Sequence, residues 1–255
     1  MREHGESDSQ AWWDSLANRL DGFQGTYQSS VICDSGEDEF VRMIREKLAQ
    51  FPVALDIGCA DGRFTHAVAS EAESMTGVDF SPVMIEKAKQ TTTNDNCSFM
   101  VADAKRLPFP DHNFDLIISR RGPVSAPVFL EEAIRVTKPG GQLVEITIGE
   151  KDACEFKEIF QRGQGYGAEQ IRSMALKKRL EDIPSIRMVA LHEYCCTAVY
   201  PSIEDVALLL SSTPIIEDFE IEQDYPYLKQ IEQRCTSSQG IERTMHRIIW
   251  AVERI

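Results

Sequence analysis

The chain has 255 residues, of which 42% are hydrophobic, enough to form a substantial buried core. Its 41 acidic and 27 basic side chains give a net charge of −14, which disfavours polyanionic partners because lysine and arginine supply most nucleic-acid affinity. Residues 1–21 are polar, and no run of about 18 uncharged apolar residues occurs, so we expect neither a signal peptide nor a membrane span.

The seven cysteines are an odd number and contain no C-x-x-C pair, which is a poor pattern for a disulfide framework. We expect reduced thiols in a cytoplasmic protein and predict no metal site. The cysteines are Cys33, Cys59, Cys97, Cys154, Cys195, Cys196 and Cys235.

In chain order, residues 11–30 predict a short amphipathic helix that runs into a polar loop, and residues 35–51 predict a second helix. From residue 52, short apolar runs alternate with helical patterns. The predicted strands are 53–58, 74–80, 97–103, 114–120 and 141–148, and the predicted helices are 63–72, 81–93 and 127–138. Beyond residue 151 the sequence predicts helical stretches, an extended run over 187–200, helices after 201 and over 217–235, and a last strand over 243–255.

Strands that alternate with helices of this length favour β-α-β units and a parallel, doubly wound α/β sheet. Such sheets bind ligands at the carboxyl ends of their strands. No linker rich in proline, glycine or serine marks the change near residue 151, so we predict a single domain over residues 1–255.

The strongest local pattern is ALDIGCADG at residues 54–62, where a strand turns into a helix. Gly58 and Gly62 allow a tight turn and close approach of a ligand. Asp56, Asp79 and Asp103 end successive strands and should meet at one edge of the sheet, where their repulsion makes a purely structural role unfavourable. A carboxylate at Asp79 can accept hydrogen bonds from both ribose hydroxyls of an adenosine. A pyrophosphate prefers amides without nearby acids, whereas a ligand with an ammonium and a sulfonium favours this set.

Four motifs in order carry a family resemblance: LDIGCADGRF, GVDFS, ADAKRLPFPDHNFDLIIS and RVTKPGGQLV. Over residues 50–148 the sequence resembles the class I S-adenosylmethionine-dependent methyltransferases, in particular the type 11 group that includes the ubiquinone-biosynthesis C-methyltransferases. The resemblance implies a mostly parallel, Rossmann-like seven-stranded sheet and S-adenosylmethionine as cofactor. It divides the domain into an N-terminal helical lid (1–50), a cofactor-binding core (51–150) and a substrate-side insert that completes the sheet (151–255).

The resemblance also implies roles for individual residues. Asp56 and the backbone of Gly58, Cys59 and Ala60 would bind the methionine end of the cofactor, and Ser119 would line it. Asp79 would bind the ribose hydroxyls. Phe80 would contact one face of the adenine, and Asp103 and the amide of Ala104 would contact the adenine edge. Ala60 stands where the family has its central glycine, which leaves less room over the turn. Pro139, Gly140 and Gly141 match the family's turn into its fifth strand.

The acceptor side is less specified, because transfer from a sulfonium is an in-line displacement in which a base is optional. We expect a small-molecule acceptor. His192, Glu193 and Tyr194 are candidates for a base, although such residues are often half-buried in strands for structural reasons. Arg120 and Arg121 either bind an anionic acceptor group or pair with local acids. In the N-terminal segment, Trp12, Trp13 and Tyr27 either close over the donor or pack onto the core.

Two alternatives remain open. The motif region also resembles ribosomal RNA guanine-N1 methyltransferases, but that group carries an N-terminal cysteine-rich zinc module that is not found in this sequence. A non-catalytic regulatory protein that keeps the cofactor fold is the second alternative, because a fold does not prove chemistry. The three retained acids argue against it.

Overall fold

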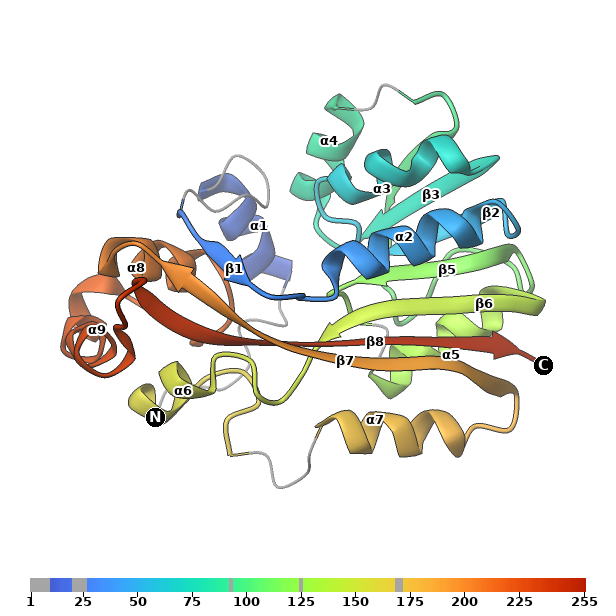
Figure 1. Ribbon diagram of the computed structural model, residues 1–255. Coiled ribbons are helices and arrows are strands. Elements are labelled where there is room, and N and C mark those ends of the chain that lie inside the picture. The colour runs from blue at the N-terminus through green and yellow to red at the C-terminus, as the bar shows by residue number, and fades with distance from the viewer. Residues whose placement is uncertain (1–9, 20–26, 92–93, 124–125, 168–171) are drawn as a thin grey trace. The chain divides into compact units, whose positions relative to one another are not determined.

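A computed structural model of the chain describes residues 10–19, 27–91, 94–123, 126–167 and 172–255 (Figure 1). Within these residues, no helix is both long and apolar enough to cross a membrane. The elements in chain order are α1 (Gln10–Arg19), β1 (Ser30–Ile32), α2 (Glu37–Leu48), β2 (Val53–Ile57), α3 (Arg63–Val68), the 3-10 helix η2 (Ala69–Glu71), β3 (Ser74–Asp79), α4 (Pro82–Gln90), β4 (Cys97–Val101), β5 (Phe114–Arg120), α5 (Pro127–Val136), β6 (Thr137–Ile148), α6 (Cys154–Phe160), α7 (Arg172–Glu181), β7 (Ile186–Tyr200), α8 (Ile203–Ser212), α9 (Ile221–Cys235) and β8 (Ile241–Arg254).

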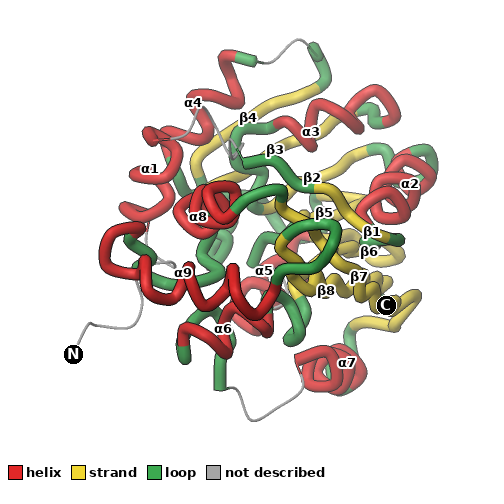
Figure 2. Tube along the Cα trace, turned by 60° about the vertical axis from the view of Figure 1, so that its left-hand side comes forward, coloured by secondary structure: helices red, strands yellow, loops and turns green. Residues whose placement is uncertain are grey.

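The strands form one sheet in the order β1-β7-β8-β6-β5-β2-β3-β4. Strands β2, β3, β4, β5 and β6 pair in parallel, whereas β1 pairs antiparallel with β7. Helices lie around the sheet (Figure 2). This confirms the predicted Rossmann-like, mostly parallel α/β fold. The described residues form eight strands rather than seven because residues 30–32, for which no strand was predicted, form the edge strand β1.

The chain divides into two compact units. Unit 1 comprises Met1–Ser35, Gly149–Arg172 and Tyr194–Arg247, and unit 2 comprises Gly36–Ile148, Ser173–Glu193 and Ile248–Ile255. Strands β7 and β8 have residues in both units. The prediction of a single domain, with its lid, core and insert, stays a prediction.

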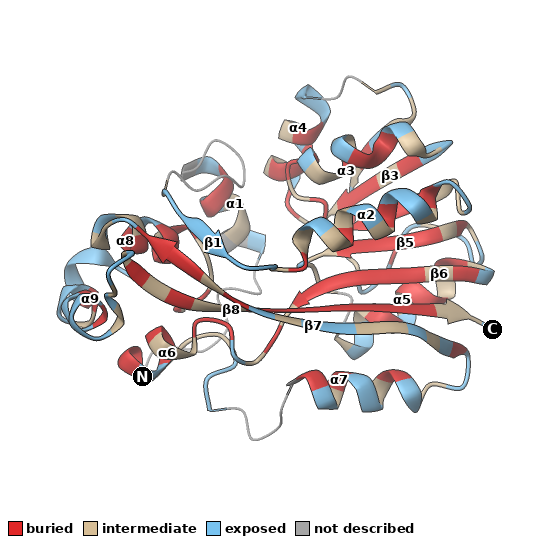
Figure 3. Cartoon of the chain, viewed as in Figure 1, coloured by how far each residue is buried: buried red, intermediate tan, exposed pale blue. Residues whose placement is uncertain are grey.

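The core of unit 2 is built from strands that are buried along most of their length (Figure 3). Leu55, Ile117 and Leu143 come from neighbouring parallel strands, and Trp250 of β8 is fully buried in the same cluster. Near-continuous apolar runs are typical of parallel strands that are covered on both faces. The indole Nε1 of Trp250 donates to Oε2 of Glu145 at 2.9 Å, which satisfies its one polar atom.

The core of unit 1 combines apolar packing with a buried ion cluster. Phe156, Leu210 and Ile231, from α6, α8 and α9, belong to one buried group. Beside it, the carboxylate of Asp152 lies 3.1 Å from Nη1 of Arg243 and 2.6 Å from Nη1 of Arg247. All three charged side chains are buried, so each of them depends on the others for its solvation.

The boundary between α5 and β6 also differs from the prediction. The helix predicted through residue 138 ends at Val136, and β6 begins at the next residue, so Pro139, Gly140 and Gly141 lie inside a strand. The pairing of β6 with β5 shifts register between Phe114 and Leu116, and Gly140 has a φ of +78°. The proline and the glycines thus form an irregular start of the strand, as expected for residues that disfavour regular pairing.

Candidate active site

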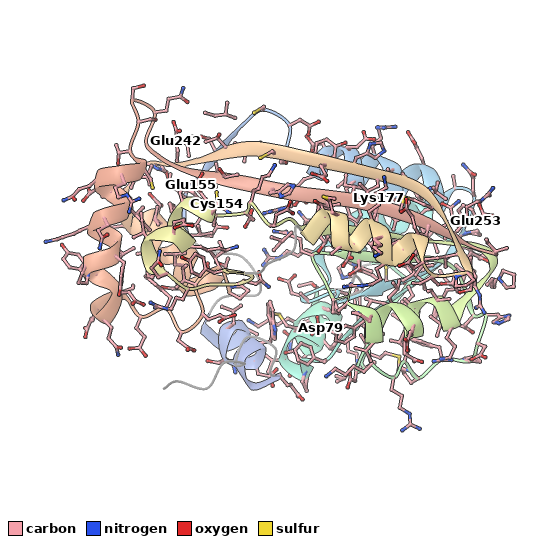
Figure 4. All side chains as sticks on the ribbon, turned by 90° about the horizontal axis from the view of Figure 1, so that it is seen from below. Asp79, Cys154, Glu155, Lys177, Glu242 and Glu253 are labelled. Atoms are coloured by element: carbon pink, nitrogen blue, oxygen red, sulfur yellow. The ribbon has the colours of Figure 1, made fainter. Side chains whose placement is uncertain are left out.

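The site lies in unit 2, at the carboxyl ends of β2, β3, β4 and β5. Asp56 is the next-to-last residue of β2, and Asp79 is the last residue of β3, three positions before the start of α4 at Pro82 (Figure 4). Asp103 follows β4 by two residues, and Ser119 is the next-to-last residue of β5. Because these strands are parallel and adjacent in the sheet, their carboxyl ends lie at one edge.

The turn after β2 brings backbone close to the site. Gly58 has a φ of +78°, and the N–H groups of Gly58 and Cys59 both donate to the carbonyl oxygen of Val78, at 2.9 and 3.0 Å. A Cβ at position 58 would lie 3.4 Å from atoms of Gly122 and Pro123, so a side chain there would fill the space beside the turn. Ala60, in the place of the family's glycine, also has a positive φ, of 48°.

The carboxylate of Asp79 is fixed in orientation by the backbone on both of its sides. Its Oδ2 accepts from the N–H of Ala60 at 3.0 Å, and its Oδ1 accepts from the N–H of Ser81 at 2.9 Å. Asp79 and the following Phe80 are half-buried. One carboxylate therefore connects the β2 turn to the start of α4 while its charge remains partly accessible.

Asp56 has a different environment. Its side chain is buried, its Oδ2 accepts from the hydroxyl of Thr65 at 2.6 Å, and within the described residues its Oδ1 has no hydrogen-bond partner. Burial raises the pKa of Asp56 to about 6, and the like charge of Asp79 adds to the rise, against the Thr65 hydrogen bond and the charge of Arg120. A cation next to Oδ1 would supply the missing partner.

The remaining residues predicted at the cofactor site differ in exposure. Cys59 is buried, and burial raises the pKa of its thiol, so the thiolate is disfavoured. Ser119 is buried with its hydroxyl donating to the carbonyl oxygen of Ile57 at 3.0 Å. Asp103 is exposed and accepts from the N–H of Lys105, while Ala104 packs half-buried against the core. Their contacts with a cofactor stay predictions.

Arg120, the last residue of β5, and the next residue, Arg121, contact the same acid. Oε2 of Glu37 lies 2.8 Å from Nη2 of Arg120, and Oε1 of Glu37 lies 3.8 Å from Nε of Arg121. The guanidinium of Arg120 also stacks over the ring of Phe64 at 5.5 Å. Pairing with an acid is one of the two roles that the sequence left open, although this acid lies 83 positions away in the chain. The anionic-acceptor role of either arginine stays a prediction.

The candidates for a base lie on β7, which is not one of the strands whose ends form the site. His192 and Glu193 are exposed in unit 2, and Tyr194 is half-buried in unit 1. Among the N-terminal aromatic residues, Trp13 is half-buried and Tyr27 packs with Tyr200 at 6.1 Å between ring centroids. The side chain of Trp12 lies outside the described residues.

Two residues of the site were not found from the sequence. Thr65 lies in the first turn of α3 and donates a hydrogen bond to Asp56. The position of Thr65 just after the glycine turn could have identified it from the sequence. Glu37 meets Arg120 across 83 positions of the chain, and a pairing at that separation leaves no local signal.

Comparison with known proteins identifies the region that holds the site. Residues 54–141 match a family model described as "Methyltransferase domain". A demethylmenaquinone methyltransferase of Staphylococcus aureus is 35% identical over 114 residues, which cover 42% of this chain and 47% of that protein. Its counterpart in Bacillus licheniformis is 34% identical over 114 residues, 42% of this chain and 49% of that protein. The chain thus spans about half the length of the curated relatives it matches.

Solved structures share the fold at low sequence identity. A methyltransferase candidate from Bacillus halodurans has a TM-score of 0.63 at 15% identity, covering 84% of this chain and 98% of that chain. A [4+2]-cyclase, SpnF, has a TM-score of 0.57 at 17% identity, covering 94% of this chain and 91% of that chain. These likenesses establish the fold and no particular reaction.

Proposed function

We propose that the protein is an enzyme that transfers the methyl group of S-adenosylmethionine to a small-molecule acceptor, because residues 54–141 match a family model described as "Methyltransferase domain" and the residues of the candidate site fit this cofactor. The observation that carries the proposal is the buried carboxylate of Asp56, whose Oδ1 has no hydrogen-bond partner among the described residues. A buried carboxylate is expensive unless it has a counter-charge or a donor, and a cationic ligand supplies both.

The chemistry of the side chains fits this cofactor. An ammonium and a sulfonium favour carboxylates and carbonyl oxygens, and Asp56 and Asp79 provide two carboxylates close enough for the charge of one to raise the pKa of the other. Because Gly58 has no side chain, a methionine end could approach the backbone of this turn closely. The partly accessible carboxylate of Asp79 would accept from the ribose hydroxyls, and Asp103 would lie toward the adenine.

When bound, the cofactor supplies a methyl carbon already activated by the sulfonium. The chain then has to hold the acceptor atom in line at about 3 Å from that carbon and to keep water from competing. Asp56 would balance the positive charge of the methionine end, while the two N–H donors to Asp79 keep its carboxylate oriented before the ligand arrives. No basic side chain is needed for an acceptor that is already nucleophilic.

Two observations support a small acceptor. The curated relatives are named for demethylmenaquinone, a small molecule. The net charge of −14 disfavours long contact with RNA phosphates.

The test has two stages. Calorimetric titration with S-adenosylhomocysteine is expected to show one binding site, and absence of binding would overturn the proposal in favour of a non-catalytic protein. Labelled S-adenosylmethionine is then offered with a panel of hydroquinone, phenol and amine acceptors and, separately, with ribosomal RNA. Transfer to a small acceptor supports the proposal. Transfer to RNA alone identifies the RNA alternative, and binding without any transfer would place the chain with fold relatives, such as a cyclase, that perform other reactions.

A further inference from the structure

Strand β7 is long, and among the described residues part of it lies unpaired at one edge of the sheet. In the sheet order β7 lies between β1 and β8, and β1 pairs only with Thr197–Val199. Within the part of the chain that the structure describes, β7 from Ile186 to Cys196 therefore has a strand partner on one side only. Every second residue of such an edge directs its N–H and C=O groups outward, ready to pair with another strand.

The edge lacks some of the features that usually prevent pairing, although it carries the charges of Arg187 and Glu193. Residues 186–196, IRMVALHEYCC, contain no proline, glycine or lysine. Val189 is 45% exposed, and the strand between Arg187 and Glu193 is exposed or half-buried (Figure 3). The side chains of Leu176 and Leu180 on α7 are buried in the core cluster of unit 2. These two side chains therefore face the core.

The sequence of this edge is complementary to itself in the antiparallel direction. If two copies pair with Ala190 opposite Ala190, then Arg187 lies opposite Glu193 of the second copy, and Val189 lies opposite Leu191 of the second copy. These residues share one face of β7, because side chains alternate along a strand. Opposite charges and apolar pairs directly across a ladder each stabilise it.

We propose that two copies of this chain associate through antiparallel pairing of β7 with β7, around a two-fold axis at Ala190. Such an interface uses the same patch on both copies and closes as a dimer. Within one chain, Arg187 already lies 3.0 Å from Glu253 of the neighbouring strand β8. In the dimer each Arg187 would thus lie between two carboxylates, Glu253 of its own chain and Glu193 of the other.

A charge exchange tests the register of the interface. All variants carry Glu253→Gln, which removes the pair within one chain and is expected to leave association almost unchanged. In that background, Arg187→Glu or Glu193→Arg places like charges opposite each other at two symmetric positions and should weaken dimerisation about tenfold. The double variant restores opposite charges and should recover most of the loss. Sedimentation equilibrium of the full chain over a wide concentration range measures the dissociation constant.

The proposal fails if the protein remains monomeric at every concentration, if the single variants dimerise as their background does, or if the double variant gives no recovery. A cross-link provides a second measurement that does not depend on electrostatics. Residues directly opposite in an antiparallel pair have Cα atoms about 4.5–5.5 Å apart, within the range of a disulfide. In a chain with Cys33→Ser and Cys195→Ser, which removes two exposed thiols, Ala190→Cys should form a covalent dimer on mild oxidation. If this covalent dimer does not form in a protein that is dimeric by sedimentation, the dimer uses another surface.

Discussion

At the scale of single residues, the two acids of the site differ in how they are solvated. Asp79 is half-buried and accepts two backbone hydrogen bonds, whereas Asp56 is fully buried and accepts one from Thr65. Burial acts on Asp56 most strongly, and its pKa rises to about 6. One acid thus supplies an oriented carboxylate, and the other gains most from a cationic ligand.

Replacing Asp79 tests its predicted contact with the ribose. Asp79→Ala removes a charged acceptor for two hydroxyls, so we expect binding of S-adenosylhomocysteine to weaken by about 2 kcal/mol or more. Asp79→Asn retains one oxygen for a backbone N–H and should lose less. Calorimetric titration under identical conditions gives both values, with urea unfolding as the check that each variant is folded. An unchanged dissociation constant in a folded Asp79→Ala would remove this residue from the site.

The raised pKa of Asp56 makes stability depend on pH. The folded state binds this proton more tightly than the unfolded state, whose pKa is near the ordinary value of 3.8. The contribution of Asp56 to stability is therefore full below about pH 4 and is lost as the pH rises through about 6. The free energy of unfolding of Asp56→Asn minus that of the wild type should therefore increase by up to about 3 kcal/mol as the pH rises across this interval.

Urea unfolding of the cofactor-free protein at several pH values measures this difference. The asparagine side chain of the variant keeps an oxygen for the Thr65 hydroxyl, so the two proteins differ mainly in the titrating group. A difference that does not change with pH would show that Asp56 titrates normally. Cofactor affinity of the wild type should rise through the same interval, because a cationic ligand favours the carboxylate.

At the scale of elements, the sequence was most informative where the pattern was local. The strands before Asp56, Asp79 and Asp103 were predicted because an apolar run, an acid and a turn follow one another within a few residues. Strand β1 was missed because Ser30–Ile32 is exposed and owes its extended form to pairing with β7, distant in sequence. The contact of Glu37 with Arg120 was missed for the same reason. Tertiary pairing over such separations has no periodic signal.

The start of α4 provides a prediction at this scale. Ser81 is the N-cap of that helix, and its Oγ accepts from the N–H of Met84 at 3.2 Å. Ser81→Ala should lower the free energy of unfolding by about 1 kcal/mol, while Ser81→Gly should cost less. The matched control is Ser202→Ala, because the Oγ of Ser202 accepts from the N–H of Asp205 at the start of α8 in unit 1. Equal stability of wild type and Ser81→Ala would contradict the capping role.

At the scale of the whole molecule, neither unit is a continuous piece of chain. Unit 2 contains the candidate site and the whole region matched to the methyltransferase family, yet it also needs Ser173–Glu193 and Ile248–Ile255. Ile248, Trp250 and Val252 of β8 are fully buried in the core of this unit. A fragment that ends soon after residue 148 would lose this part of the core, so the family match is shorter than the folding unit.

The buried Trp250 tests this dependence directly. Trp250→Ala should destabilise the protein by about 3–5 kcal/mol, because it leaves a cavity in the core of unit 2. Trp250→Phe keeps most of the ring volume but loses the hydrogen bond to Glu145, and should cost less than the alanine change. Urea unfolding measures the stability of each variant. Titration with S-adenosylhomocysteine, at a temperature where both variants are folded, measures the affinity of the candidate site. We expect cofactor affinity within about twofold of wild type for Trp250→Phe, since Trp250 contributes no contact to the acids of the site. A stable Trp250→Ala protein would show that unit 2 does not need the end of β8 for its core.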